Sequence, residues 1–225
     1  MLLNSPHLSN IESIADTSRG KRSAHVDLQT PDGRAALERL LADAHVFVQG
    51  YRPGALDALG FSPQQIAARR PGIVCVSLSA YGQTGPWRER RGFDSLVQTA
   101  TGFNHAEAEA AGSAEPKPLP MQILDYVTGH LMAFAAVAAL HRQVLEGGSW
   151  QVRLSLAQTA HWLRNLDRVA NGFAIALPDR TTFLETAASG FGELVALRHS
   201  AIFERTPTLW AHPSMPPGSH SPLWT

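Results

Sequence analysis

The chain has 225 residues, of which 44% are hydrophobic and 17% charged, and this composition excludes a disordered protein. Its length allows one large domain or slightly more. Nineteen basic residues balance nineteen acidic ones, so no global field attracts nucleic acid or an anionic membrane, and we expect neither as a partner.

Cysteine content and hydropathy predict the compartment. Cys75 is the single cysteine, which excludes an intrachain disulfide and favours a reducing, cytoplasmic location. The N-terminal residues offer too short an apolar segment for a secretory signal. The longest apolar run, Leu131 to Leu140, is about half of what spans a bilayer, so we expect a soluble protein.

The first half of the chain alternates between strand and helix patterns. Residues 1–24 are polar and predicted to be irregular, ending in a basic cluster of Arg19, Lys21 and Arg22. Thr30 and Pro31 have the residue types that start a helix. The patterns predict strands over 24–28, 45–49 and 72–80, and helices over 30–44, 54–60 and 62–70.

The second half begins with a glycine-rich loop over 81–92. Its patterns predict helices over 94–103, 126–145 and 158–170, a loop over 104–120, and strands over 150–157 and 192–199. The end of the chain is too rich in proline for regular structure. We therefore expect an N-terminal arm over 1–24, an α/β domain over 25–170 and a C-terminal segment over 171–225.

Strands that alternate with helices predict an α/β fold: an open, mostly parallel, Rossmann-like sheet flanked by helices. Such sheets bind ligands beyond the carboxyl ends of their strands. Three polar or cationic loops leave predicted strands, at residues 29–30, 50–52 and 80–92. These loops are where we expect a site.

Asp125 stands where the most apolar helix of the chain begins, and two interpretations of it are open. Aspartate is a preferred N-cap, because its side chain accepts hydrogen bonds from the first N–H groups of a helix. A partly desolvated carboxylate is also a candidate nucleophile, with free N–H groups nearby to hold a developing oxyanion. The two roles are compatible.

The cationic residues also leave alternatives open. Three groups of basic residues either bind phosphate or are solvated. They are Arg52, the triplet of Arg88, Arg90 and Arg91, and the basic cluster of Arg19, Lys21 and Arg22. The sequence contains no GxxxxGK[ST], GxGxxG, HExxH or CxxC motif, and its histidines lack the spacing of metal ligands. We therefore expect a small anionic ligand and no metal.

Several stretches, taken together, resemble class III CoA-transferases, the family that includes formyl-CoA and carnitine CoA-transferases. The resemblance covers about Ser18 to Gln158. The similar stretches are SRGKRSAHVDLQTPDG, HVFVQGYRPG, GIVCVSLSAYGQTGPW with the GFD that follows, ILDYVTGH, and GGSWQVRLSLAQ.

This resemblance implies a CoA-transferase that moves coenzyme A between an acyl-CoA thioester and a carboxylic acid. Asp125 matches the family's catalytic aspartate, which forms a mixed anhydride with the acyl group and then an aspartyl-CoA thioester. By the same match, the contacts to CoA fall on three segments, which comprise Val26, Asp27, Leu28 and Gln29, then Gly50, Tyr51 and Arg52, and finally Arg91, Gly92, Phe93 and Asp94.

The chain also departs from the family pattern. Gly50 stands where the family has an asparagine, and Ala58 where some members carry a basic residue. Family members are longer, with a first strand–helix unit and a small domain that this sequence largely lacks. We therefore expect either a fragment or a subunit that a second chain completes, and family members form interlocked homodimers.

Two other functions remain open. An α-methylacyl-CoA racemase shares the fold and the aspartate, but it needs a histidine in a Gly-His-Asp motif, which here is Gly92-Phe93-Asp94. The second is a truncated homologue or subunit that keeps the fold without turnover.

Overall fold

The computed structural model describes residues 1–7 and 13–224. Internal contacts divide the chain into two compact units, the first made of Met1–Leu40 with Ala176–Thr225 and the second of Leu41–Ile175. The domain boundaries predicted after residues 24 and 170 follow composition rather than these contacts and stay a prediction. Residues 8–12 of the predicted N-terminal arm lie outside the described residues.

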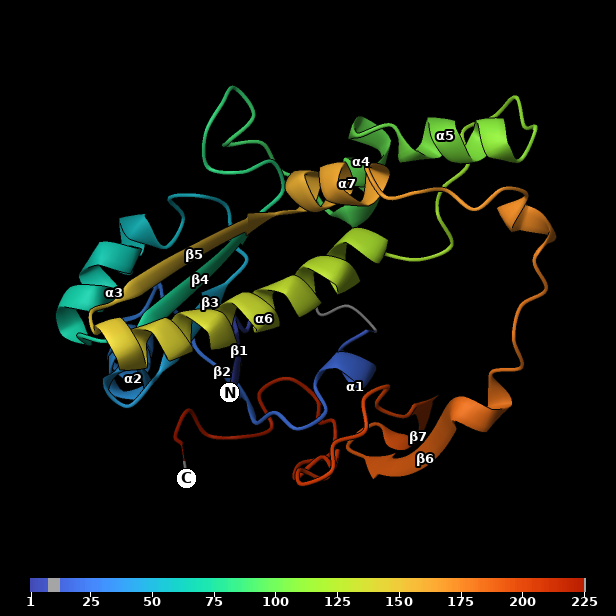
Figure 1. Cartoon of the computed structure of the whole chain (residues 1–225). Coiled ribbons are helices and arrows are strands. Elements are labelled where there is room, and N and C mark those ends of the chain that lie inside the picture. The colour runs from blue at the N-terminus through green and yellow to red at the C-terminus, as the bar shows by residue number, and fades with distance from the viewer. Residues whose placement is uncertain (8–12, 225) are drawn as a thin grey trace. The chain divides into compact units, whose positions relative to one another are not determined.

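The strands and longer helices alternate through most of the chain (Figure 1). In chain order they are β1 Leu2–Asn4, α1 Ile14–Thr17, β2 Ser23–His25, α2 Pro31–Ala42, β3 Val46–Gln49, α3 Pro63–Arg69, β4 Val74–Ser79, α4 Asp94–Ala100, α5 Phe103–Ala110, α6 Ile123–Glu146, β5 Trp150–Ser155, α7 Leu156–Arg164, β6 Leu184–Ser189 and β7 Gly192–Leu197. Short 3-10 turns cover Asp57–Leu59, Gly172–Ala174 and Thr181–Phe183.

The second unit contains a parallel sheet in the order β3-β4-β5. The central strand β4 is buried on both faces, with Val74 and Val76 on one face and Cys75 and Ser77 on the other, as expected for a parallel strand covered by helices. Helix α6 packs along one face, where Ala139 joins the two valines in a core cluster. The predicted α/β class with mostly parallel pairing is confirmed.

The predicted strand over 24–28 is β2, and it does not pair with β3 in one sheet. It forms a separate parallel pair with β1 in the first unit, where Leu2 lies opposite Ser23 and Asn4 opposite His25. The prediction of an irregular arm is therefore wrong for residues 2–4 and for α1. Strand β1 has three residues and is too short to show the alternation of apolar and polar residues that predicts a strand. It forms because it pairs with β2, which its own sequence does not reveal.

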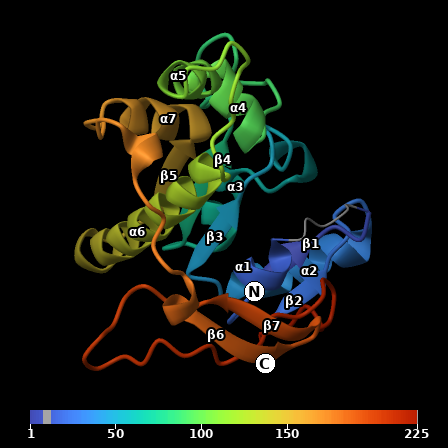
Figure 2. The same ribbon diagram turned by 90° about the vertical axis from the view of Figure 1, so that its right-hand side faces the viewer.

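The C-terminal part of the first unit contains an antiparallel hairpin of β6 and β7 (Figure 2). The predicted strand over 192–199 is confirmed as β7, whereas β6 was not predicted. The last residues return to α2, where the indole N–H of Trp224 donates to the carbonyl of Leu40 at 3.0 Å.

Arg19 connects the N-terminal and C-terminal parts of the first unit. Its side chain is 14% exposed, pairs with Asp16 at 2.6 Å and with Glu185 at 3.0 Å, and stacks over Trp210. Lys21, from the same basic cluster, donates to the carbonyl of Thr17 at 2.6 Å. The two cations are thus used for contacts inside this unit.

We expect Arg19→Ala to lower the free energy of unfolding by about 1–3 kcal/mol. The substitution removes a nearly buried guanidinium together with its contacts to two carboxylates and one aromatic face. Urea unfolding measures the change. Arg39→Ala on the exposed side of α2 is the control, with an expected change within about 0.5 kcal/mol. Equal stability of the two variants would contradict the role given to Arg19.

The boundaries of α4, α5 and α7 in the second unit differ from prediction. The single helix predicted over 94–103 is two helices, α4 and α5, separated at Gly102, whose φ of 84° lies in the left-handed region. The loop predicted over 104–120 therefore begins with most of α5. Strand β5 ends and α7 begins earlier than predicted, because the Ser155 hydroxyl accepts from the Gln158 N–H at 3.2 Å and caps α7.

Helix α6 is long and apolar, and one side of it is exposed. It has 24 residues, and 17% of its most apolar 18-residue window, of mean hydropathy 1.6, is buried. By length and composition it could cross a membrane, although core helices of soluble proteins pass the same test. Its most exposed large side chains are Phe134, Val137, Val144 and Leu145. The expectation that no membrane is involved stays a prediction.

Candidate functional site

Asp125 lies in the first turn of α6 and not at its N-cap. The helix begins at Ile123, three residues before the predicted start, and Gln122 holds the capping position. The interpretation of Asp125 as N-cap is therefore wrong. Another helix supplies the capping group: Oδ2 of Asp94, on α4, accepts a hydrogen bond from the backbone N–H of Asp125 at 2.8 Å.

Asp94 is fully buried, and both of its carboxylate oxygens accept hydrogen bonds. Its Oδ1 accepts from Nε2 of Gln98, one turn further along α4. Nε2 of Gln98 also donates to the carbonyl of Met121 at 3.0 Å. The pair of Asp94 and Gln98 thus binds the backbone of the chain on both sides of the start of α6.

The Asp125 side chain remains exposed, while its environment raises its pKa. The larger cause is partial desolvation of the carboxyl group by the surrounding protein, and the second is repulsion from the nearby Asp94 carboxylate. A carboxylate with a raised pKa is more basic, and therefore more nucleophilic, than an ordinary aspartate. The carboxyl group of Asp125 is thus accessible and has a raised pKa.

An apolar cluster supports this turn from below. Leu124 is fully buried against Val97 of α4 and Leu156 and Ala160 of α7. One turn along α6, the Thr128 hydroxyl donates to the Thr159 hydroxyl at 2.8 Å in the buried contact with α7. The residues on either side of Asp125 are thus fixed while its carboxyl group faces outward.

Two of the predicted CoA-binding loops leave neighbouring parallel strands. Gly50, Tyr51 and Arg52 follow the carboxyl end of β3, and Arg91 to Phe93 close the loop that follows β4. The side chains of Tyr51 and Phe93 are 42% and 81% exposed, and both arginines are exposed. Parallel strands end at the same edge of a sheet, so both loops lie where such folds bind ligands.

A cavity of about 280 Å³ opens at the same ends of β4 and β5. Ser79 and Gln83 line one side, Leu131 of α6 and Trp162 of α7 the other, and Arg153 of β5 adds a cation. Its walls combine apolar surface with a few polar groups, as small-molecule sites do. Sequence patterns did not indicate this cavity, because its walls come from four separate elements.

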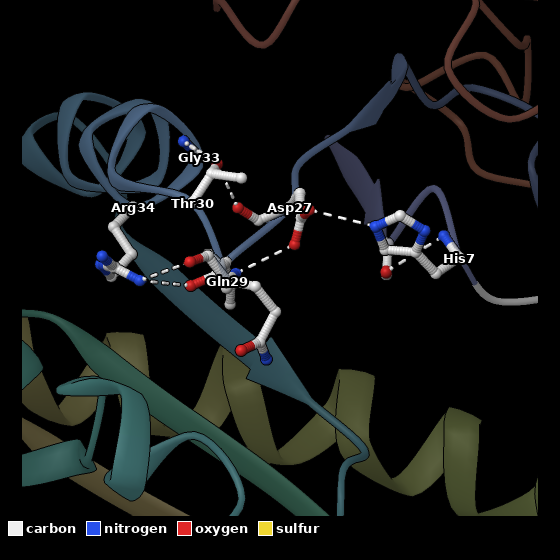
Figure 3. Close-up of polar contacts among 8 residues, drawn as sticks. His7, Asp27, Gln29, Thr30, Gly33 and Arg34 are labelled. Carbon is white, nitrogen blue, oxygen red and sulfur yellow. Dashed lines mark hydrogen bonds and ion pairs between the residues drawn. The ribbon is translucent and has the colours of Figure 1, made fainter.

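The remaining predicted contacts, Val26 to Gln29, belong to the first unit and connect β2 to α2. Figure 3 shows Asp27 organising this turn. Its Oδ1 accepts from the Gln29 N–H at 2.9 Å and its Oδ2 lies 3.1 Å from Nε2 of His7, and these bonds lower the pKa of Asp27. Val26 is buried and Gln29 exposed, so within this segment Gln29 is the residue open to solvent.

Thr30 caps α2 as predicted. Its hydroxyl donates to the carbonyl of Asp27 at 2.8 Å and accepts from the Gly33 N–H at 3.0 Å (Figure 3). The Arg34 guanidinium donates to the carbonyls of Leu28 and Gln29, at 2.9 and 3.1 Å. The turn is thus held by side-chain hydrogen bonds within its own unit. Whether these residues share a CoA site with the loops of the second unit stays a prediction.

Across residues 1–7 and 13–224, no group of three or more histidine, cysteine, aspartate or glutamate side chains could hold a metal ion. Cys75 is buried in β4, and burial raises the pKa of its thiol to about 11. The thiol is therefore protonated at neutral pH.

Known proteins are similar to this chain in sequence and in fold. Residues 10–182 match CoA-transferase family III. A probable fatty acyl-CoA transferase of Mycobacterium tuberculosis, Rv3272, is 32% identical over 161 residues, which cover 68% of this chain and 40% of the relative. The alpha subunit of a succinyl-CoA–L-malate CoA-transferase of Chloroflexus aurantiacus is 26% identical over 158 residues, covering 70% of this chain and 36% of the relative.

Solved structures show the same fold. The crystal structure of Rv3272 in its orthorhombic form matches 65% of this chain and 40% of its own, with a TM-score of 0.60 and 32% identity. An aspartate-to-alanine mutant of Rv3272 matches 97% of this chain and 88% of its own, with a TM-score of 0.80 at 17% identity. The chain spans 40% or less of the length of the two curated relatives described above. With more than half of its residues matched, the chain belongs to CoA-transferase family III.

Proposed function

We propose that the protein transfers coenzyme A from an acyl-CoA thioester to a carboxylic acid, with Asp125 as the nucleophile. The observation that carries the proposal is the carboxyl group of Asp125, exposed and with a raised pKa on a helix turn that two other helices hold in place. Family membership supports the reaction class. The relatives' names support acyl-CoA and a carboxylic acid as substrates.

The reaction proceeds in two symmetrical halves. An oxygen of the Asp125 carboxylate attacks the thioester carbonyl, the C–S bond breaks, and CoA leaves as a thiolate from an aspartyl-acyl anhydride. The thiolate then attacks the Asp125 carbonyl of the anhydride, which releases the first acid and leaves an aspartyl-CoA thioester. The second acid reverses these steps and regenerates the Asp125 carboxylate. The covalent intermediates conserve the thioester bond energy that hydrolysis would lose.

One experiment distinguishes CoA transfer from racemisation and from a non-catalytic homologue. The full chain is incubated in deuterated water with palmitoyl-CoA or succinyl-CoA and a ¹³C-labelled carboxylic acid, and the products are separated by mass spectrometry. Transfer gives labelled acyl-CoA. Deuterium at the α-carbon without labelled product would indicate racemisation, for which Phe93 offers no base. No conversion of either kind would favour a non-catalytic homologue.

Gly50 offers a gain-of-binding prediction. A Cβ at this position would meet no heavy atom within 4 Å among the described residues, so a larger side chain fits. We expect Gly50→Asn to restore the family's side-chain contact and lower the KM for acyl-CoA about 2- to 10-fold, the equivalent of one hydrogen bond. Gly50→Ala, which adds the Cβ without the amide, is the control. A KM of Gly50→Asn equal to that of Gly50→Ala would contradict the contact.

We further propose that a second copy of the chain covers the exposed side of α6. Four large apolar side chains there are each at least 67% exposed, and they comprise Phe134, Val137, Val144 and Leu145. Apolar surface of this extent on one helix is typical of an interface. The interlocked homodimers of the family resemblance support a copy of the same chain as the occupant.

Analytical ultracentrifugation tests this interface. We expect the wild-type chain to sediment as a dimer, and Phe134→Glu to sediment as a monomer, because burying an unpaired charge within the interface is strongly unfavourable. Ala68→Glu, on the exposed side of α3, is the control that leaves the dimer intact. A monomeric wild-type chain, or a Phe134→Glu dimer of equal stability, would contradict a second copy on this face.

A further inference from the structure

We propose that Asp94 is a positioning residue, which holds the first turn of α6 so that the carboxyl group of Asp125 points outward to the substrate. This inference rests on the proposed function, because it gives a role to a residue that acts through Asp125. It differs from the expectation that Asp94 contacts CoA. The side chain of Asp94 has no exposed surface, and both of its oxygens already accept hydrogen bonds from the protein.

The hydrogen bond to Asp125 fixes the residue through its backbone. An N–H group in the first turn of a helix has no partner within the helix, so it needs an acceptor from elsewhere. Oδ2 of Asp94 is that acceptor, at 2.8 Å from the Asp125 nitrogen. The bond leaves the carboxyl group of Asp125 free, whereas a capping role would have used that group on its own helix.

Gln98 completes the arrangement on the other side of the helix start. Its side-chain nitrogen donates both to Asp94 and, at 3.0 Å, to the carbonyl of Met121. The chain is thus held at Met121 and at Asp125, the two positions between which α6 begins. A shift of about 1 Å in the placement of a reacting group can cost on the order of 100-fold in rate, so a device that fixes this turn has a catalytic consequence.

The charge of Asp94 adds an electrostatic effect to the positioning. The elements packed against α6 bring few other charges: His161 and Arg164 on α7 and Arg153 on β5. Arg164 is engaged with the carbonyl of Thr101. Asp94 is the charge that, after desolvation, raises the pKa of Asp125. Removing this charge therefore changes the titration of Asp125, which a purely structural contact would not do.

The test compares Asp94→Asn, Asp94→Ala and Gln98→Ala in the full chain. Transfer assays give kcat and KM, and ¹³C NMR of labelled aspartate carboxyl groups, assigned with Asp125→Asn, gives the titration of Asp125. We expect Asp94→Ala to lower kcat about 10- to 100-fold with the KM for acyl-CoA within about 2-fold. Asp94→Asn keeps an acceptor oxygen, so we expect it to retain more of kcat than Asp94→Ala does. In Asp94→Asn we expect Asp125 to titrate at lower pH than in the wild-type protein. The exposed Asp57→Asn is the control that changes neither.

Specific results would overturn the inference. A raised KM with unchanged kcat in Asp94→Ala would make Asp94 a contact to CoA, and an unchanged titration of Asp125 in Asp94→Asn would remove its electrostatic role. If Asp94→Ala does not fold, Asp94→Asn and Gln98→Ala carry the test, and Gln98→Ala is expected to lower kcat without raising KM. The NMR titration needs no turnover, so it separates a failure of this inference from a failure of the proposed transfer reaction.

Discussion

Asp125→Asn is expected to lower the rate of CoA transfer by at least about 1,000-fold, since it removes the attacking oxygen of the reaction. Asparagine has nearly the same shape, and the backbone N–H that Asp94 holds is unchanged by the substitution. We therefore expect stability within about 1 kcal/mol of wild type and little change in binding of acyl-CoA. The loss then belongs to the chemical step and appears in kcat.

Steady-state assays with varied acyl-CoA measure this change, with Asp57→Asn as a matched carboxyl-to-amide control on an exposed turn. The pH profile of the wild-type protein adds a second measurement. Asp125 must be ionised to attack, so kcat falls as the pH falls through its pKa, which desolvation and the nearby Asp94 carboxylate raise from the ordinary aspartate value. Wild-type rates in Asp125→Asn would exclude Asp125 as the nucleophile.

Leu124→Ala is expected to lower the free energy of unfolding by about 2–5 kcal/mol, the range for truncating a buried leucine. Leu124 has no exposed surface and joins α6 to Val97 of α4 and to Leu156 and Ala160 of α7. The cavity left behind lies directly beneath Asp125. We therefore also expect a lower kcat at temperatures where the variant is still folded, because the first turn of α6 loses its packing.

Urea unfolding of the chain measures the change in stability. Leu96→Ala, on the outward side of α4 where the side chain is 51% exposed, is the control and is expected to cost less than about 1 kcal/mol. A cost for Leu124→Ala as small as that of the control would show that the apolar cluster does not support this helix turn.

Local sequence signals predicted the elements that carry their own information. The apolar run of β4 indicated a buried parallel strand, and Thr30 and Ser62 marked helix starts that their side chains do cap. Capping depends on residues three positions apart, so it is visible in sequence. The stretches that resemble class III CoA-transferases are also local in sequence, and they indicated Asp125 as a candidate without knowledge of the structure.

Features that depend on distant residues could not be predicted. Asp125 has the residue type and position of an N-cap, so the local sequence made it a candidate. Its neighbours cannot show that Asp94, 31 residues earlier, supplies the capping group instead. The pairing of β1 with β2 likewise depends on a partner and not on a period. The spacing of Asp94 and Gln98, four residues apart on one helix, was the available signal for their contact. That signal does not reveal which backbone groups the pair holds.

Together these contacts relate the sequence to the proposed chemistry. The apolar cluster fixes α4, α6 and α7 against one another, and the pair of Asp94 and Gln98 sets where α6 begins. The position of that start places the carboxyl group of Asp125 at the surface, in an environment that makes it more basic. The loops after β3 and β4 are then the proposed contacts for CoA.

The central claim is that Asp125 becomes covalently activated by acyl-CoA, and chemical trapping tests it most directly. The full chain is incubated with acyl-CoA and hydroxylamine, digested, and analysed by tandem mass spectrometry. Hydroxylamine attacks an aspartyl anhydride or thioester and leaves a hydroxamate on the aspartate. The account predicts a hydroxamate at Asp125 that requires acyl-CoA. Its absence from Asp125 in a protein that transfers CoA, or its formation at another carboxylate, would contradict the account.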